Sequence, residues 1–225
     1  MSERILMIET STDCCSVALS GDGRILAEVV DPTPRQQSAM LAPHISQVLQ
    51  EAGLTVADLD AVAVSEGPGS YTGLRVGVST AKGLCFGGGK PLIGIDTLQI
   101  LALQAEGSFD RIVAMIDARR MEVYAATFDG DGHKLSDTEA VILDAGSFSD
   151  LLDAGSVLFI GTGAAKFRDI CHHPHARFQD CPPLASVMLQ PSRTALQKKE
   201  FEATAYFEPF YLKEFVAGIS KKAVL

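Results

Sequence analysis

The apolar residues of this chain fall into short continuous runs and longer helical repeats. The clearest unit is residues 61–90, where the run Ala61–Val64 predicts a short buried strand. A glycine-rich turn, Gly67–Ser70, breaks that run. Thr72 is suited to cap a following helix over Gly73–Phe86, because its hydroxyl can accept from a backbone N–H one turn on. One stripe of that helix is apolar: Leu74, Val78, Ala81 and Cys85.

The same patterns extend over the first hundred residues. Apolar runs predict strands, and helical repeats that end at glycine or begin at a capping residue predict helices. The predicted strands are Ile5–Ile8, Ser16–Ser20, Arg24–Val30, Ala61–Val64 and Leu92–Ile95, and the predicted helices are Gln36–Gln50, Gly73–Phe86 and Thr97–Ala105. This order, β-β-β-α-β-α-β-α, is typical of an α/β fold with a mixed sheet.

The opening pattern occurs a second time, about 107–109 residues later. Each copy is a strand that ends in an acid, then a turn, a second strand and a Gly-Asp-Gly hairpin, and the acids are Glu9 and Asp117. We therefore predict two similar lobes, 1–106 and 107–225, the second a degenerate copy with a mobile C-terminal tail. Its remaining predicted elements are a helix over Ser147–Leu152, a strand over Val157–Ile160, helices over Ala164–Ile170 and Leu184–Gln190, and a short edge strand over Phe210–Leu212.

Composition narrows the class of protein. The chain has 225 residues, is 47% hydrophobic and carries a formal net charge of −9. An acidic protein is a poor direct ligand for nucleic acid, since such binding depends on Lys and Arg neutralising phosphates, so we expect little direct binding of this chain to nucleic acid. No apolar run approaches the ~20 residues of a membrane span. Five irregularly spaced cysteines and no secretory signal predict a reduced, cytoplasmic protein.

The predicted helix over 73–86 contains glycines that weaken it. Each glycine in a helix interior costs about 1 kcal/mol relative to alanine. Gly73, Gly77 and Ala81 are spaced by four and form a smooth strip. The strip could pack on the chain's own sheet, or it could receive a partner helix. For the second alternative the interface residues would be Met40, Leu41, Gly73, Leu74, Gly77, Val78 and Ala81.

Few residues form a pattern that is typical of a catalytic, metal or anion-binding site. Gly67, Gly69 and Ser70 precede a helix N-terminus that could attract an anion, but no window completes a Walker loop or a dinucleotide fingerprint. Arg119 and Arg120, on the second lobe's first turn, could also contact a nucleotide or a partner. The Cys- and His-rich segment 171–181 lacks the convergent spacing of a zinc site, so we predict an exposed loop and no metal. We predict no catalytic residues and no bound cofactor for the chain alone.

Three segments together carry a family resemblance. They are Ile8–Ser11 (IETS), Glu66–Arg75 (EGPGSYTGLR) and Asp117–Tyr124 (DARRMEVY), and the ending Pro209–Leu212 also fits. The chain resembles the TsaB (YeaZ) family, within the actin-like, sugar-kinase and Hsp70 ATPase (ribonuclease H-like) superfamily. It departs from the family's pattern at Gln37–Ala39 and at Met121.

The resemblance implies a role in the bacterial tRNA threonylcarbamoyladenosine machinery. Such a subunit is a non-catalytic scaffold that dimerises through first-lobe helices. Its partners would be a TsaD-type catalytic subunit and a TsaE-type ATPase, with ATP or ADP at a partner interface. The catalytic relative binds metal through two histidines four apart, and Thr97 and Leu101 stand at those places here. The alternative is a free-standing enzyme of the superfamily, either a small-molecule kinase or ATPase, or a metal-dependent glycopeptidase.

Overall fold

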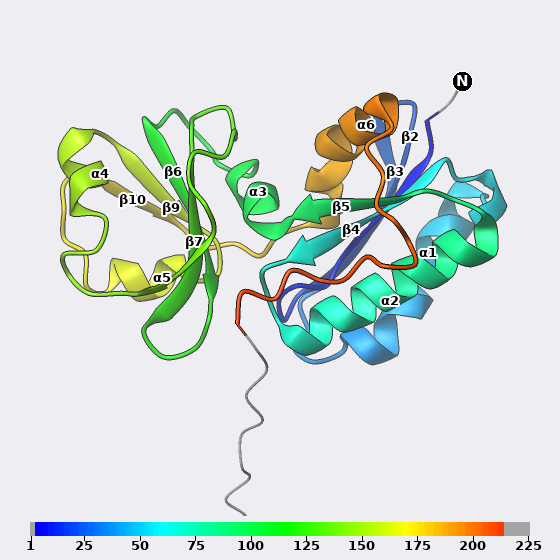
Figure 1. The fold of residues 1–225 in the computed structure, drawn as a ribbon, viewed down its shortest axis with the longest axis horizontal. Coiled ribbons are helices and arrows are strands. Elements are labelled where there is room, and N and C mark those ends of the chain that lie inside the picture. The colour runs from blue at the N-terminus through cyan, green and yellow to red at the C-terminus, as the bar shows by residue number, and fades with distance from the viewer. Residues whose placement is uncertain (1–2, 214–225) are drawn as a thin grey trace, which may run out of the picture.

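The computed structural model describes residues 3–213, which form two α/β lobes side by side (Figure 1). The strands are β1 (Ile5–Glu9), β2 (Cys15–Gly21), β3 (Arg24–Asp31), β4 (Ala61–Gly67), β5 (Leu92–Asp96), β6 (Arg111–Asp117), β7 (Glu122–Phe128), β8 (Glu139–Ile142), β9 (Val157–Ile160) and β10 (Ala176–Gln179). The helices are α1 (Gln37–Ala52), η1 (Val56–Asp58), α2 (Tyr71–Gly88), α3 (Thr97–Ala102), α4 (Ser149–Ala154), α5 (Ala164–Arg168), η2 (Ala185–Met188) and α6 (Leu189–Lys198).

The two sheets have the same topology, which confirms the predicted repeat. The first sheet has the order β3-β2-β1-β4-β5, and the second, read from its far edge, has the order β8-β7-β6-β9-β10. In each lobe the first strand pairs antiparallel with the second and parallel with the fourth. The chain is therefore a two-lobe α/β fold built from one duplicated arrangement of strands.

Helices cover both faces of the first sheet. On one face α1 and α2 pack on the buried strands through Leu41, Ile45, Val78 and Ala81. On the other face η2 and α6 cover the sheet, and Ala185 and Met188 are fully buried there. All five side chains of β1 are buried, as expected for a central strand covered on both faces.

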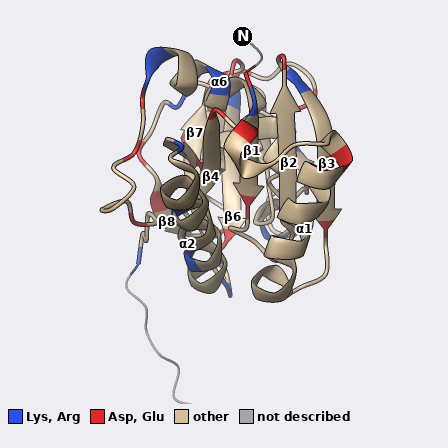
Figure 2. Ribbon diagram, turned by 90° about the vertical axis from the view of Figure 1, so that its right-hand side faces the viewer, with Lys and Arg blue, Asp and Glu red and all other residues tan. Residues whose placement is uncertain are grey.

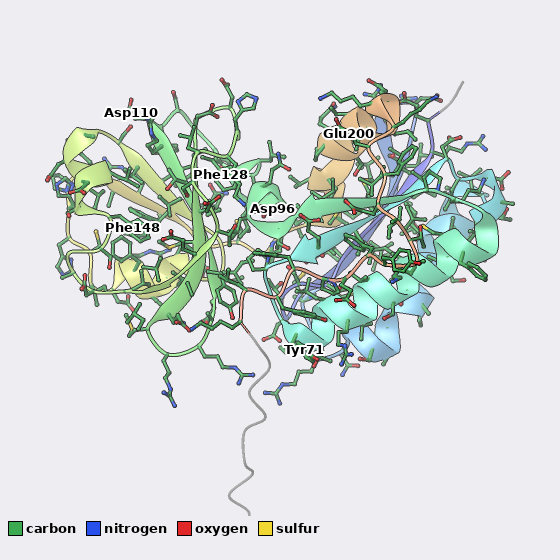
Figure 3. All side chains as sticks on the ribbon, viewed as in Figure 1. Tyr71, Asp96, Asp110, Phe128, Phe148 and Glu200 are labelled. Atoms are coloured by element: carbon green, nitrogen blue, oxygen red, sulfur yellow. The ribbon has the colours of Figure 1, made fainter. Side chains whose placement is uncertain are left out.

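The second lobe has its own core on each face of its sheet. One side is an aromatic cluster in which Phe159 and Phe167 meet edge to face, with ring centroids 4.7 Å apart, and Phe148 packs beside them (Figure 3). The other side is filled by α3, whose Leu98 and Leu101 are buried among residues of β6, β7 and β9. The lobe is therefore stabilised by a helix that precedes its first strand.

The predicted lobe boundaries are wrong in two places. The helix that begins at Thr97 was assigned to the first lobe, but α3 packs mainly in the second-lobe core. Residues 184–198 were assigned to the second lobe, but η2 and α6 pack on the first sheet. Both errors have one cause: the chain crosses between lobes twice, and local patterns do not show which sheet a helix will cover.

The structure also differs from the prediction at several helices and strands. Ser70, rather than Thr72, caps α2, and its hydroxyl accepts from the Gly73 N–H at 3.3 Å. Strands β8 and β10 were not predicted as strands. Pro191 lies in the first turn of α6, where the helix tolerates it. The predicted edge strand Phe210–Leu212 is not a strand, and most of the predicted mobile tail lies outside the described residues.

The last described segment, residues 200–213, is a strap that runs over the free edge of β5 and along α2 toward the second lobe (Figure 1). Its Glu202 N–H donates to Leu92 O at 2.9 Å, and Phe207 is buried in the first-lobe core. Within residues 3–213, no helix combines the length and hydrophobicity that crossing a bilayer requires.

Candidate functional site

The acids that end the first strand of each lobe make the same local contact. Glu9 Oε1 accepts from the Ser11 N–H at 2.5 Å, and Asp117 Oδ1 accepts from the Arg119 N–H at 2.6 Å. Each carboxylate thus caps a turn two residues on, which is a common role for acids in turns. Asp117 is also paired with Lys166 Nζ at 2.7 Å. The structure therefore supports a turn-capping role for both acids.

Burial gives Glu9 unusual electrostatics. The residue is 0% exposed, and Oε2 has no hydrogen-bond partner among the described residues. Burial raises the pKa of this carboxyl from 4.5 to about 7, against the lowering effect of hydrogen bonds from Ser11 and Ser65. At a pKa of about 7 this carboxyl is about half protonated at neutral pH, so it carries less negative charge than an ordinary glutamate.

The glycine-rich turn is packed against the β1–β2 turn. The Ser70 N–H donates to Ser11 O at 2.6 Å, and a β-carbon added at Gly69 would overlap the same carbonyl. Gly67 adopts φ +120°, and a β-carbon there would lie 2.6 Å from Phe210 O of the strap. These glycines are explained by close backbone approach within the chain, so this turn does not fit a phosphate as a Walker loop would.

Arg119 and Arg120 lie exposed on the β6–β7 turn, both at positive φ. Among the described residues, no hydrogen bond or ion pair joins them to the glycine-rich turn. No hydrogen bond or ion pair within residues 3–213 therefore brings the two halves of the predicted anion site together, and both arginines lie exposed at the surface.

The predicted interface strip is internal. Leu41, Leu74, Val78 and Ala81 are at most 3% exposed, and Gly73 and Gly77 are also buried, while Met40 is half-buried. A β-carbon at Gly73 would overlap Thr10 O, and one at Gly77 would overlap the Thr10 hydroxyl. The prediction that these residues form a contact surface is therefore wrong for all but Met40, because the others are already packed in the first-lobe core or against Thr10.

A different part of α2 is exposed, and the sequence analysis did not single it out. Phe86 is 89% exposed in the last turns of the helix, and Gly83 and Gly87 have no atom near the place of an added β-carbon. On the strap, Tyr206 is 86% exposed. Lys82 Nζ donates to the carbonyls of Ala205 (3.2 Å) and Phe207 (2.8 Å), which fixes the backbone on both sides of that tyrosine.

No metal site is formed at the candidate positions. Thr97 and Leu101 are fully buried. His175 Nδ1 lies 2.8 Å from Leu152 O, and Cys171 is buried apart from it in the aromatic core. The one cluster of three potential ligands within residues 3–213 is Asp129, Asp131 and His133, an exposed hairpin in which the Asp129 carboxylate accepts the N–H groups of the other two residues.

Comparison with known proteins shows the family to which the chain belongs. A family model described as TsaD, tRNA N6-adenosine threonylcarbamoyltransferase, matches residues 25–221. The tRNA threonylcarbamoyladenosine biosynthesis protein TsaB of Escherichia coli (strain K12) is 33% identical over 223 residues, which cover 95% of this chain and 96% of that protein. The chain belongs to the TsaB (YeaZ) family.

Other TsaB relatives agree over the full length. TsaB of Haemophilus influenzae (strain ATCC 51907 / DSM 11121 / KW20 / Rd) is 29% identical over 231 residues, covering 94% of each protein. The solved structure of YeaZ from Pseudomonas aeruginosa superposes with a TM-score of 0.82 at 29% identity, covering 93% of this chain and all of that one. The resemblance to TsaB therefore extends over more than nine-tenths of the chain and is not limited to the three sequence motifs.

Proposed function

We propose that this chain is a non-catalytic scaffold subunit that supports threonylcarbamoyl transfer to the adenosine next to the tRNA anticodon. The observation that carries the proposal is the end-to-end match to TsaB of Escherichia coli. A TsaD-type subunit would perform the transfer, and a TsaE-type ATPase would complete the machinery. The five cysteines are free thiols, as suits a protein of the reducing cytoplasm.

The residues at the two-lobe junction support a non-catalytic role. Glu9 is buried, Asp117 is paired with Lys166, and Thr97 and Leu101 offer no imidazole. The test is transfer of labelled threonylcarbamate to tRNA by the purified chain, alone and with its TsaD- and TsaE-type partners. We expect product only in the complete mixture, and product from the chain alone, free of partners, would disprove the proposal.

The proposed partner surface is the outer face of α1 and α2 with the strap beside it. Only Glu51, Arg75 and Lys82 carry charge at neutral pH in these two helices, although 21% of the whole chain is charged. The helices are accordingly almost free of red and blue in Figure 2. Interface cores are depleted in charge and enriched in aromatic residues, and Phe86 and Tyr206 provide exposed aromatic groups here.

The exposed glycines sharpen this proposal. Gly73 and Gly77 are needed for internal packing, but Gly83 and Gly87 face open space and still cost the helix about 1 kcal/mol each. A backbone that must approach this part of α2 closely would account for them. We propose that a second copy uses this face in a homodimer when the chain is alone, and that the TsaD-type partner takes the same face in the complex.

The interface test must use exposed positions. Val78→Arg is unsuitable because Val78 is core, so we choose Gly83→Arg, which introduces a long charged side chain without filling occupied space. We expect sedimentation to show loss of self-association and a pull-down to lose the TsaD-type partner. The matched control is Thr194→Arg, an exposed position of α6 on the opposite face of the sheet. Equal association of both variants with the parent would rule out this face.

Nucleotide and RNA contacts are expected to need the complex. We propose that ATP or ADP binds at a partner interface, with Arg119 and Arg120 as candidate contacts, because both are exposed on a turn. The net charge of −9 gives the chain alone little attraction for tRNA. Tight, salt-sensitive tRNA binding by the isolated chain at physiological ionic strength would contradict this expectation.

A further inference from the structure

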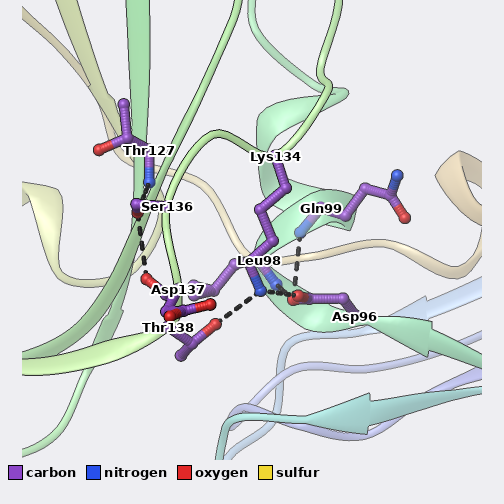
Figure 4. Close-up of polar contacts among 8 residues, drawn as sticks. All are labelled: Asp96, Leu98, Gln99, Thr127, Lys134, Ser136, Asp137 and Thr138. Carbon is purple, nitrogen blue, oxygen red and sulfur yellow. Dashed lines mark hydrogen bonds and ion pairs between the residues drawn. The ribbon is translucent and has the colours of Figure 1, made fainter.

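Two side-chain ties join the lobes at separate places along their junction. At one, Lys134 of the β7–β8 loop reaches Asp96 at the end of β5 (Figure 4). At the other, Lys213 at the end of the strap pairs with Glu122 at the start of β7. The first tie links a lysine of the second lobe to a carboxylate of the first lobe. The second tie links a lysine of the strap, which lies on the first lobe, to a carboxylate of the second lobe.

Asp96 lies where the two lobes meet and uses both of its oxygens (Figure 3). Oδ1 accepts from the N–H groups of Leu98 (2.7 Å) and Gln99 (3.4 Å), and so caps α3, the helix buried in the second-lobe core. Oδ2 accepts from Lys134 Nζ at 2.5 Å. One carboxylate of the first sheet therefore holds two separate elements of the second lobe.

Lys134 is held in position before it reaches across. Its ammonium also donates to Thr138 Oγ1 at 2.7 Å, and its backbone forms an isolated antiparallel bridge with Phe128. The Ser136 hydroxyl, two residues on, accepts from the Thr127 N–H at 2.9 Å (Figure 4). Because the loop is ordered by these contacts, less side-chain entropy is lost when the lysine forms its ion pair.

The lysine faces an acidic group of residues from three elements. The pKa of Glu66 is raised from 4.5 to about 7, mainly by burial and then by the neighbouring carboxylates of Asp96 and Glu202, while Lys134 acts to lower it. Glu66 comes from β4, and Glu202 comes from the strap. Lys134 is thus the cation that offsets repulsion among carboxylates at the edge where β4, β5 and the strap converge.

The strap makes the second tie. The Phe210 N–H donates to Glu66 O at 2.7 Å, and Tyr211 packs on Tyr71 with ring centroids 4.8 Å apart. Three residues after Phe210, Lys213 reaches Glu122 of the second lobe. The strap is therefore fixed to the first lobe immediately before it reaches the second.

We propose that these two lysines are latches that hold the lobes at one fixed angle without a nucleotide. The two lysine–carboxylate pairs supply this connection between the lobes from side chains of the chain itself. Fixing the angle keeps the β6–β7 turn, with Arg119 and Arg120, in a constant position relative to α2. A partner that contacts both lobes then meets a preorganised surface, which reduces the entropy lost on binding.

The test measures the distance between the lobes directly. Spin labels are placed at the exposed positions Ser46 of α1 and Ala145 of the second lobe, in a Cys181→Ser background that removes the partly exposed native thiol. Double electron–electron resonance should give a single narrow distance distribution for the parent, unchanged by Mg-ATP. In Lys134→Met with Lys213→Met, the distribution should broaden and shift to longer distances.

Two controls make the result specific. Lys134→Arg keeps the charge and should keep the narrow distribution, and Lys198→Met breaks only an exposed pair with Glu200 inside the first lobe and should change nothing. Both lysines of the double variant are partly exposed, and circular dichroism checks that it is folded. A parent-like distance distribution in the folded double variant would overturn the proposal. So would a parent whose distance distribution is broad and narrows only when Mg-ATP is added.

Discussion

Replacing Glu9 with glutamine tests the electrostatics of the closed junction. The side chain is 0% exposed, its Oε1 accepts from the Ser11 N–H, and its Oε2 is unpartnered among the described residues. Glutamine has nearly the same shape, can accept the same hydrogen bond and carries no charge at any pH. The variant therefore separates the effect of ionisation from the effect of packing.

The magnitude follows from the pKa. The carboxyl has a pKa of about 7 in the folded chain, compared with 4.5 ordinarily, so the folded state binds the proton more tightly than the unfolded state. The stability that this proton provides is fully present below pH 4.5 and is lost as pH rises to about 7. At about 1.36 kcal/mol per pKa unit, the loss is roughly 3 kcal/mol.

Urea unfolding of both proteins between pH 4.5 and 8 measures this loss. The free energy of unfolding of the parent should fall relative to that of Glu9→Gln by roughly 3 kcal/mol across the range, with most of the change below pH 7. Glu66 titrates in the same window in both proteins, so its contribution cancels in the difference. A difference between the two proteins that stays constant from pH 5 to pH 8 would refute the reasoning.

Two further predictions concern α2 and the strap. Gly77→Ala should destabilise the chain by about 1–3 kcal/mol, because the added methyl overlaps the Thr10 hydroxyl. Gly83→Ala should instead stabilise the monomer by up to about 1 kcal/mol, since no atom lies near the added methyl group. Thermal unfolding of both variants measures the two effects, and equal shifts of Tm would contradict the packing analysis. Lys82→Met removes two hydrogen bonds to the strap, so amide exchange over residues 203–211 should accelerate while α6 stays protected. Unchanged exchange in the strap would contradict this prediction and mean that its backbone bonds to Leu92 and Glu66 and the buried Phe207 hold it without Lys82.

The sequence by itself determined the repeat and most of the strands. The runs that begin at Ile5 and Ile112 are central strands, and central strands have two buried faces, so their apolar character is visible in one dimension. The long helices α1 and α2 were likewise predicted within a few residues of their ends. The acids at the ends of both first strands were found for the same reason, since they follow these runs directly.

The sequence analysis does not predict the short, partly exposed strands. Strands β8 and β10 have four residues each, and their pairing partners are β7 and β9. Such segments become strands through the neighbour they pair with more than through their own composition. A pattern of apolar positions cannot identify them, because only Ala176 of these two strands is buried.

Tertiary structure alone decided the roles of the glycines and charged residues. Gly77 and Gly83 look equivalent in one helix, but one contacts Thr10 and the other faces open space. Asp96 caps α3 through a local bond, whereas its second bond, to Lys134, joins residues 38 positions apart. A sequence pattern records which face of an element is apolar. Which surface covers that face, and which charge lies opposite, depends on the path of the whole chain through space.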